Sequence, residues 1–186
     1  MRWLPWILAI VWLAVRWAAG EYTGYDFEKG RTAGVLANLL IILVVLFGGL
    51  ISRYKKPLAK APTFMEDVRT GAGAAMKYVI GVTAAMALWY FTVSPELPMR
   101  RDRDHAANAA LIDTPEKLEK VKQEYDQLKT LGADEILAAA NERTDLMTSP
   151  GFIVSSSFIG LLFTALLYSF LGAFIFRQFI RREPAQ

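Results

Sequence analysis

Apolar residues fall into four long blocks along the chain, and polar or charged segments separate these blocks. The blocks cover residues 3–19, 33–51, 74–93 and 152–176. Each block is about 17–25 residues long, which is the length that an α-helix needs to cross roughly 30 Å of hydrocarbon. The pattern predicts an all-α integral membrane protein with four transmembrane helices and an amphipathic helical segment between the third and fourth.

The predicted organisation follows these blocks. Residues 1–51 contain the first two transmembrane helices, and residues 52–72 form a basic loop that includes an interfacial helix. Residues 73–94 form the third helix, residues 95–151 a helical outer segment, and residues 152–186 the fourth helix with a basic tail. We interpret the first block as a retained span and not as a signal peptide, because no clear small-x-small cleavage motif follows it.

The distribution of Lys and Arg predicts how these helices are oriented. Segment 52–72 and the tail after residue 176 are basic, whereas residues 94–151 carry twelve acidic and eight basic residues. Because cytoplasmic loops of membrane proteins are enriched in Lys and Arg, we expect a bacterial inner-membrane protein whose two termini are both cytoplasmic. The basic side chains expected to contact lipid headgroups are Arg16, Arg53, Lys55, Lys56, Arg177 and Arg181.

The net charge of +3 is interpreted as a sign of this topology. The basic residues flank the apolar blocks and do not form one patch, so the charge does not indicate a nucleic-acid partner. Phospholipid and other integral membrane subunits are the partners that the sequence favours.

Two basic residues, Arg16 and Lys77, interrupt apolar blocks. Near a helix end, a long basic side chain can reach back to the headgroups while its stem stays in hydrocarbon. For Lys77, pairing with an acid or a carbonyl on a neighbouring helix is the alternative. Since no Asp or Glu lies inside the four blocks, an acidic partner within the membrane would belong to another subunit. We favour contact with headgroups because the predicted third helix begins only a few residues before Lys77.

The polar segments carry helix-start signals. Thr63 and Glu66 have the spacing of a capping box, which predicts a short interfacial helix before the third span. Thr114 followed by Pro115 predicts another helix start. We expect that helix to end at Gly132 and a second one to cover residues 133–145. Two such short helices bury too little apolar surface to fold alone, so we expect them to lie on the membrane, on the spans or on a partner.

Small residues recur at four-residue steps in the third and fourth blocks, a pattern that allows close helix contact in a membrane. Packing within the chain is the common explanation for such lines. The line that contains Lys77 is the one that we expect to face another protein. The candidate packing or partner contacts are Gly73, Lys77, Gly81 and Ala85 in the third block, and Ser156, Gly160, Thr164, Ser169 and Ala173 in the fourth.

The sequence offers little catalytic chemistry. It contains no cysteine, which excludes disulfides, iron–sulfur clusters and thiolate metal sites. The single histidine, His105, cannot supply both axial ligands of a bis-His haem. Phosphate-binding glycine loops, zinc-protease motifs and nucleophile-elbow motifs are not found in the sequence. We therefore expect no catalytic, metal or cofactor site.

Several short motifs resemble those of an uncharacterised Bacteroidota membrane family, domain of unknown function 4199. They are Thr63-Phe64, Gly71 at the opening of the third span, Pro95 after it, and the Ser-Pro-containing lead "TSPGFIVSSSF" into the last span. The resemblance covers most of the chain, although the outer segment is richer in Arg and Ala than expected of that family. The resemblance implies a four-span membrane fold and implies no activity.

Taken together, these features predict a non-catalytic accessory, assembly or stabilising subunit of a larger bacterial inner-membrane complex. Two other classes remain open at this point. A small oligomeric transporter or channel would place several copies of the chain around a pore. A membrane sensor would use the outer segment as its receptor, whereas a membrane enzyme would need a catalytic site that the sequence does not show.

Overall fold

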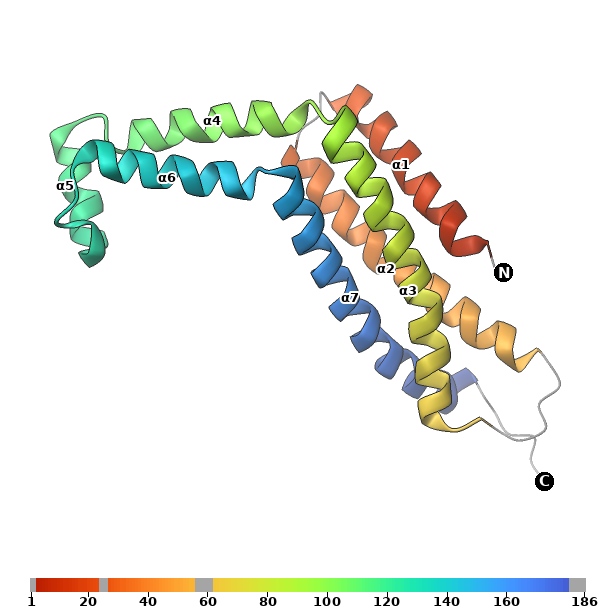
Figure 1. Cartoon of the computed structure of the whole chain (residues 1–186). Helices are drawn as coiled ribbons and strands as arrows, with labels where there is room; N and C mark the ends of the chain where they lie inside the picture. Colours follow the sequence, from red (N-terminus) through yellow and green to blue (C-terminus); the bar gives the residue numbers. More distant parts are fainter. Residues whose placement is uncertain (1–2, 24–26, 56–61, 181–186) are drawn as a thin grey trace.

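A computed structural model describes residues 3–23, 27–55 and 62–180 of the chain (Figure 1). Within these ranges all regular elements are helical. The seven longer helices are α1 Leu4–Thr23, α2 Phe27–Tyr54, α3 Phe64–Leu88, α4 Glu96–Leu111, α5 Pro115–Glu124, α6 Ala133–Met147 and α7 Pro150–Ile175, and the three short helical turns are η1 Trp89–Val93, η2 Asp126–Leu128 and η3 Phe176–Ile180.

Three stretches are long and apolar enough to cross a membrane: Thr32–Tyr54, Phe64–Val93 and Pro150–Phe179. The apolar part of α1, Leu4–Ala18, is shorter. These stretches confirm the expected helical membrane class. They correspond to the second, third and fourth blocks of the sequence.

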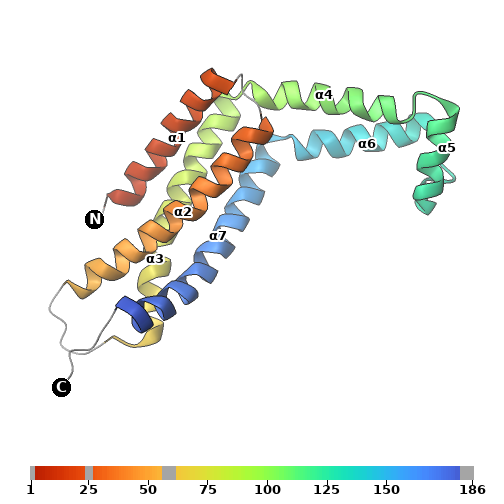
Figure 2. The same cartoon turned by 180° about the vertical axis from the view of Figure 1, so that it is seen from behind.

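Helices α1, α2, α3 and α7 lie side by side in both views and form a bundle (Figures 1 and 2). Helix α3 lies at its centre, since its contacts with the other three are the most extensive in the bundle. The main core includes Ile42, Tyr78, Val82 and Ala165, which come from α2, α3 and α7. Because lipid tails are as apolar as these side chains, close van der Waals packing holds such helices together rather than the exclusion of water.

Glycines permit the closest of these contacts. A Cβ atom on Gly81 of α3 would lie 3.1 Å from the Trp6 ring and 3.2 Å from the Cβ atom of Ala9, both on α1. A Cβ atom on Gly49 of α2 would lie only 2.8 Å from that of Ala74 on α3. Larger residues at these two positions would therefore push α1 or α2 away from α3.

Helix α3 begins earlier than the apolar pattern predicts. The Thr63 hydroxyl accepts from the Glu66 amide, and the Glu66 carboxylate accepts from the Thr63 amide at 2.8 Å, which confirms the capping box. The helix then runs without a break to Leu88. The expectation of a separate interfacial helix is corrected, because these residues form the first turns of the third long helix.

At its other end, α3 widens into a π-type turn. The Ser94 amide donates to the carbonyl of Trp89, five residues earlier, at 2.9 Å. The Thr92 hydroxyl also bonds to the Leu88 carbonyl. Pro95 and Glu96 then begin α4, so the wide turn joins the bundle directly to the segment outside it.

Residues 96–147 form an arm that leaves the bundle at one end. Helices α4 and α6 run side by side along the arm, and α5 lies at its tip (Figures 1 and 2). The amide nitrogen of Asn108 on α4 donates to Asn141 Oδ1 and Thr144 Oγ1 on α6, at 3.1 Å in each case. Few apolar side chains are buried here, Leu97 and Ile136 among them.

The arm agrees only in part with the sequence-based expectations. Thr114 caps α5 as predicted, and α6 begins at Ala133 as predicted. Helix α5 ends at Glu124, however, and does not reach Gly132, since the 3₁₀ turn Asp126–Leu128 follows it. Helix α4 was not anticipated.

Candidate functional site

An ion pair lies inside the protein where the arm meets the bundle. Arg16 of α1 donates from its Nη2 atom to the Oε1 atom of Glu96, the first residue of α4. Arg16 is 8% exposed and Glu96 is 2% exposed. Charges withdrawn from solvent to this degree are tolerated only when they are paired. The pair therefore ties the end of α1 to the root of the arm.

One tryptophan contacts this ion pair, and a second packs against the first. Trp89 is fully buried, and its indole Nε1 lies 3.5 Å from Glu96 Oε1. The rings of Trp89 and Trp17 meet edge to face, with their centroids 6.0 Å apart. We call Arg16, Trp17, Trp89 and Glu96 the arm-end cluster.

Helix α2 also approaches the arm-end cluster. Gly30 lies so close to the Arg16 guanidinium that a side chain there would clash with it. Because glycine has no side chain, the Arg16 guanidinium can occupy this space.

The position of Arg16 corrects a sequence-based expectation. Arg16 was expected to contact lipid headgroups, but it is buried against Glu96. Depth along one helix gave no information about a partner that is 80 positions away in the sequence. The one available signal was Glu96 itself, an acid that directly follows a long apolar block.

A second buried charge lies at the opposite end of the bundle. Asp67 of α3 is 0% exposed and accepts a hydrogen bond of 2.8 Å from Arg177 Nε. The Tyr54 hydroxyl lies 2.9 Å and 3.0 Å from the two Asp67 carboxylate oxygens. Arg177 also donates to the Pro62 carbonyl. We call Tyr54, Asp67 and Arg177 the tail-end cluster, and it joins α2, α3 and the turn after α7.

Arg53 adds a further link at this end. Its Nη1 atom donates to Thr70 Oγ1 at 2.6 Å and to the Glu66 carbonyl at 3.1 Å, and its Nη2 atom lies 3.4 Å from Glu66 Oε2. Arg53 and Arg177 were expected at lipid headgroups, and the structure instead pairs both with groups of α3. Lys55 is exposed as expected of a headgroup contact, while Lys56 and Arg181 lie outside the described residues.

A neutral hydrogen bond lies between these two clusters. The Tyr78 hydroxyl of α3 donates to Asn38 Oδ1 of α2 at 2.6 Å, and both residues are buried. A buried amide in an apolar bundle is stable only with such a partner. The sequence analysis did not single out either residue, although an asparagine within a block that has no charge was an available signal.

The small-residue line around Lys77 does not face one direction. Gly81 packs against α1, and Ala85 packs against the main core. Gly73 and Lys77 are exposed on the surface of the bundle, and apart from chain neighbours and the backbone of its own helix no atom of the described residues lies within 4 Å of a Cβ built on Gly73. The expectation that the whole line faces another protein is therefore corrected for Gly81 and Ala85.

The small residues of the last helix, α7, also face different directions. Ser169 and Ala173 are fully buried within the bundle. Ser156 and Gly160 are exposed on the opposite surface, with open space around Gly160, and Thr164 is half-buried between the two sides. Ser169 and Ala173 are thus packing contacts of the chain itself.

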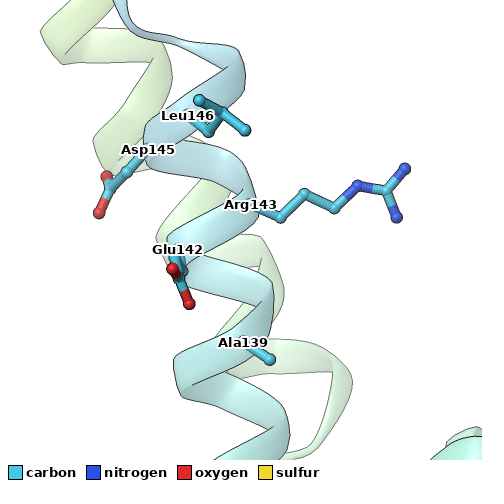
Figure 3. Close-up of a pocket in the computed structure, with 5 residues that line it drawn as sticks. All are labelled: Ala139, Glu142, Arg143, Asp145 and Leu146. Carbon is cyan, nitrogen blue, oxygen red and sulfur yellow. The ribbon is translucent and has the colours of Figure 1, made fainter.

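A shallow hollow lies on α6 of the arm, lined by Ala139, Glu142, Arg143, Asp145 and Leu146. Arg143 points away from the side on which Glu142 and Asp145 lie, so these side chains do not converge (Figure 3). Asp145 instead faces α4, where its Oδ1 atom lies 3.1 Å from His105 Nε2. Among the described residues no group of three acids or histidines could hold a metal ion.

The candidate functional features of the described residues are therefore the arm-end cluster, the tail-end cluster and the arm, which the arm-end cluster anchors to the bundle. No protein-family model, curated protein or solved structure matches this chain. The resemblance to domain of unknown function 4199 accordingly stays a prediction.

Proposed function

We propose that this protein is a non-catalytic accessory or assembly subunit of a larger bacterial inner-membrane complex, and that its arm contacts the partner. The observation that carries the proposal is the shape of the arm, a narrow helical hairpin that projects from the bundle (Figure 1). A hairpin of this kind buries little of its own surface, so most of its side chains are available to a second protein.

Large apolar side chains lie exposed along this arm. Exposed apolar surface outside a membrane marks sites of contact with proteins or lipid. Met99 and Leu111 on α4 are 52% and 60% exposed, and Leu146 on α6 is 59% exposed. Their exposure supports the proposal that a partner protein covers the arm in the assembled complex.

The buried ion pair supports the same proposal. Arg16 and Glu96 hold the root of α4 against α1 and Trp89. A root fixed in this way gives the arm a defined direction before any partner binds. Preorganisation of this kind lowers the entropic cost of association.

We further propose that α1 is a fourth span. Its 20 residues would extend about 30 Å at 1.5 Å per residue, close to the thickness of the hydrocarbon core. Its contact with Gly81 and its ion pair with Glu96 keep it alongside α3. With four spans and a basic loop at 52–72, both termini lie in the cytoplasm and the arm lies outside the membrane on the periplasmic side.

This topology is tested with single cysteines at Ala59 and Ala109 in intact bacteria. A membrane-impermeant maleimide should label Ala109→Cys from outside and should label Ala59→Cys only after the cells are opened. Labelling of both from the same side would contradict the four-span arrangement.

The accessory role is tested by crosslinking in living cells. A photo-reactive amino acid at Ala107 on the arm should give an adduct of defined mass with another protein. The same group at Ala84, an exposed residue of α3, should give no adduct. An adduct of about twice the 20.8 kDa chain would instead favour the oligomeric transporter or channel. If only Ala84 gave an adduct, the arm would not be the contact surface.

A further inference from the structure

One outward face of α3 carries two positive charges with open space between them. Arg69, Gly73 and Lys77 follow at four-residue steps, so they lie above one another on the same side of the helix. All three are exposed, and among the described residues no other part of the protein than its own helix lies within 4 Å of a Cβ built on Gly73. This face therefore has two cations separated by a place where the helix backbone is accessible.

The depth of Lys77 can be measured from the tail-end cluster. Asp67 is bonded to Arg177 and Tyr54, which marks the polar level at that end of the bundle. Lys77 is ten residues further along α3, or about 15 Å at 1.5 Å per residue. Its α-carbon thus lies within the apolar stretch Phe64–Val93.

The helix geometry directs the lysine back toward Arg69. Side chains of an α-helix lean toward its N-terminus, and the N-terminus of α3 is at the tail end. An extended lysine stem reaches about 6 Å, the rise of four residues, so the Lys77 ammonium arrives near the level of Gly73. The missing side chain of Gly73 leaves the space through which the stem passes.

The nearby acids are already bonded to other cations. Glu66 lies 3.4 Å from Arg53, and Asp67 is buried against Arg177. In the described part of the chain neither Arg69 nor Lys77 has an ion pair or a side-chain hydrogen bond. Two positive charges are therefore left at the surface of α3.

We propose that Arg69, Gly73 and Lys77 form a binding site for the headgroup phosphate of an anionic phospholipid. The lipid lies in the leaflet at the tail end, which is the cytoplasmic leaflet in the proposed topology. Its phosphate lies between the Lys77 ammonium and the Arg69 guanidinium, which also leans toward the tail end. Its acyl chains follow the exposed apolar surface near Ile80. A zwitterionic headgroup would bring its own ammonium close to the two cations, so an anionic headgroup is favoured.

This site is independent of the arm and of the proposed accessory role. The test uses the full-length protein in nanodiscs of phosphatidylcholine with a minor fraction of phosphatidylglycerol. Native mass spectrometry then counts the lipids that stay bound after release from the nanodisc. The wild-type protein should retain phosphatidylglycerol, and Lys77→Gln and Arg69→Gln should each lower that retention by about fivefold, the typical effect of one basic side chain at an anionic surface.

Two further variants separate charge from shape. Gly73→Leu leaves the charge unchanged but fills the space through which the Lys77 stem passes, and it should lower retention as strongly as Lys77→Gln. Lys120→Gln removes an exposed cation on the arm and should have no effect. Circular dichroism of each variant checks that its helices are intact.

Equal retention of phosphatidylglycerol by the wild type, Lys77→Gln and Gly73→Leu would overturn the site, as would equal retention of phosphatidylcholine. A loss of the crosslink at Ala107 in Lys77→Gln would also overturn it, because the lysine would then serve a protein partner. Failure of that crosslink in the wild type would bear only on the accessory role and would leave the lipid site standing.

Discussion

The two ends of the bundle each bury an acid with an arginine, but they satisfy the acid differently. At the arm end both members of the pair are enclosed, with side-chain exposures of 9% for Arg16 and 1% for Glu96. At the tail end Asp67 is enclosed, whereas 30% of the Arg177 side chain is exposed. A second donor, the Tyr54 hydroxyl, also reaches Asp67. The tail end therefore has a second donor at 2.9 Å and a partly exposed arginine, whereas the second donor at the arm end, Trp89 Nε1, lies 3.5 Å from Glu96 Oε1.

Two polar atoms of the arm-end pair have no hydrogen-bond partner among the described residues. Among the described residues, Arg16 Nε and Glu96 Oε2 are buried and have no hydrogen-bond partner. A buried polar atom that loses its partner costs more than a hydrogen bond itself contributes. The arm-end cluster thus depends mainly on the Arg16–Glu96 pairing, and loss of either member should be more damaging than loss of a member of the tail-end cluster.

Glu96→Ala should have the largest effect on stability. It leaves the Arg16 guanidinium buried without its anion, and breaking a buried ion pair typically costs about 3–5 kcal/mol. The measurement is the free energy of unfolding in mixed detergent micelles during titration with sodium dodecyl sulfate. Glu96→Gln, which keeps an acceptor, should fall between the wild type and the alanine variant.

A double variant checks the cause. Replacing a buried pair by apolar residues of similar size is often neutral, so Arg16→Met combined with Glu96→Met should recover most of the stability lost in Glu96→Ala. A double variant as unstable as the single one would show that the charge left behind is not the source of the loss.

Asp67→Asn should have a smaller effect. The half-exposed Arg177 can turn toward polar surroundings, and Tyr54 can still donate to the amide oxygen. We expect a loss of about 1.5–3 kcal/mol, the range for hydrogen bonds to a charged group, in the same unfolding assay. A loss greater than that of Glu96→Ala would reverse the order of the two ends.

Tyr78→Phe tests the neutral bond between the two clusters. It removes the donor to Asn38 and should cost about 0.5–1 kcal/mol, as do other neutral hydrogen bonds between membrane helices. Tyr168→Phe on α7 is the matched control, since Tyr168 is also half-enclosed by the bundle but has no hydrogen bond among the described residues. Equal losses of unfolding free energy in Tyr78→Phe and Tyr168→Phe would show that the Tyr78–Asn38 hydrogen bond does not stabilise the bundle.

Lys77→Gln should have the smallest effect on stability. Lys77 is exposed and lacks a protein partner in the described residues, so its change should lie within about 0.5 kcal/mol, the usual range for such surface positions. The variant should also stay associated with whatever co-purifies with the wild type. Release by Gln with retention by Arg would show that a partner requires the charge itself.

The sequence predicted those features that depend on neighbouring residues. The capping box of Thr63 and Glu66 and the helix start at Thr114 both rest on contacts three residues apart, and both are present. The apolar blocks predicted α2, α3 and α7 for the same reason. These signals are local, so one stretch of chain contains all the information needed.

The sequence could not predict the features that join distant segments. Arg177 and Asp67 are 110 positions apart, so nothing near either residue indicates their contact. The start of α3 was misplaced because Asp67 interrupts the apolar pattern, and only its buried partners explain why it belongs in the helix. Helix α4 was missed because its sequence alternates arginine and aspartate and offers few large apolar residues at helical spacing.

The joint between α3 and α4 has a mechanical consequence. Helix α4 has 16 residues and so extends about 24 Å from the buried Glu96. A rotation of about 10° at the wide turn Trp89–Val93 would move the far end of such a rod by roughly 4 Å. A tilt of the arm about its buried root, even one too small to disturb the packing of the bundle, would therefore be amplified at α5.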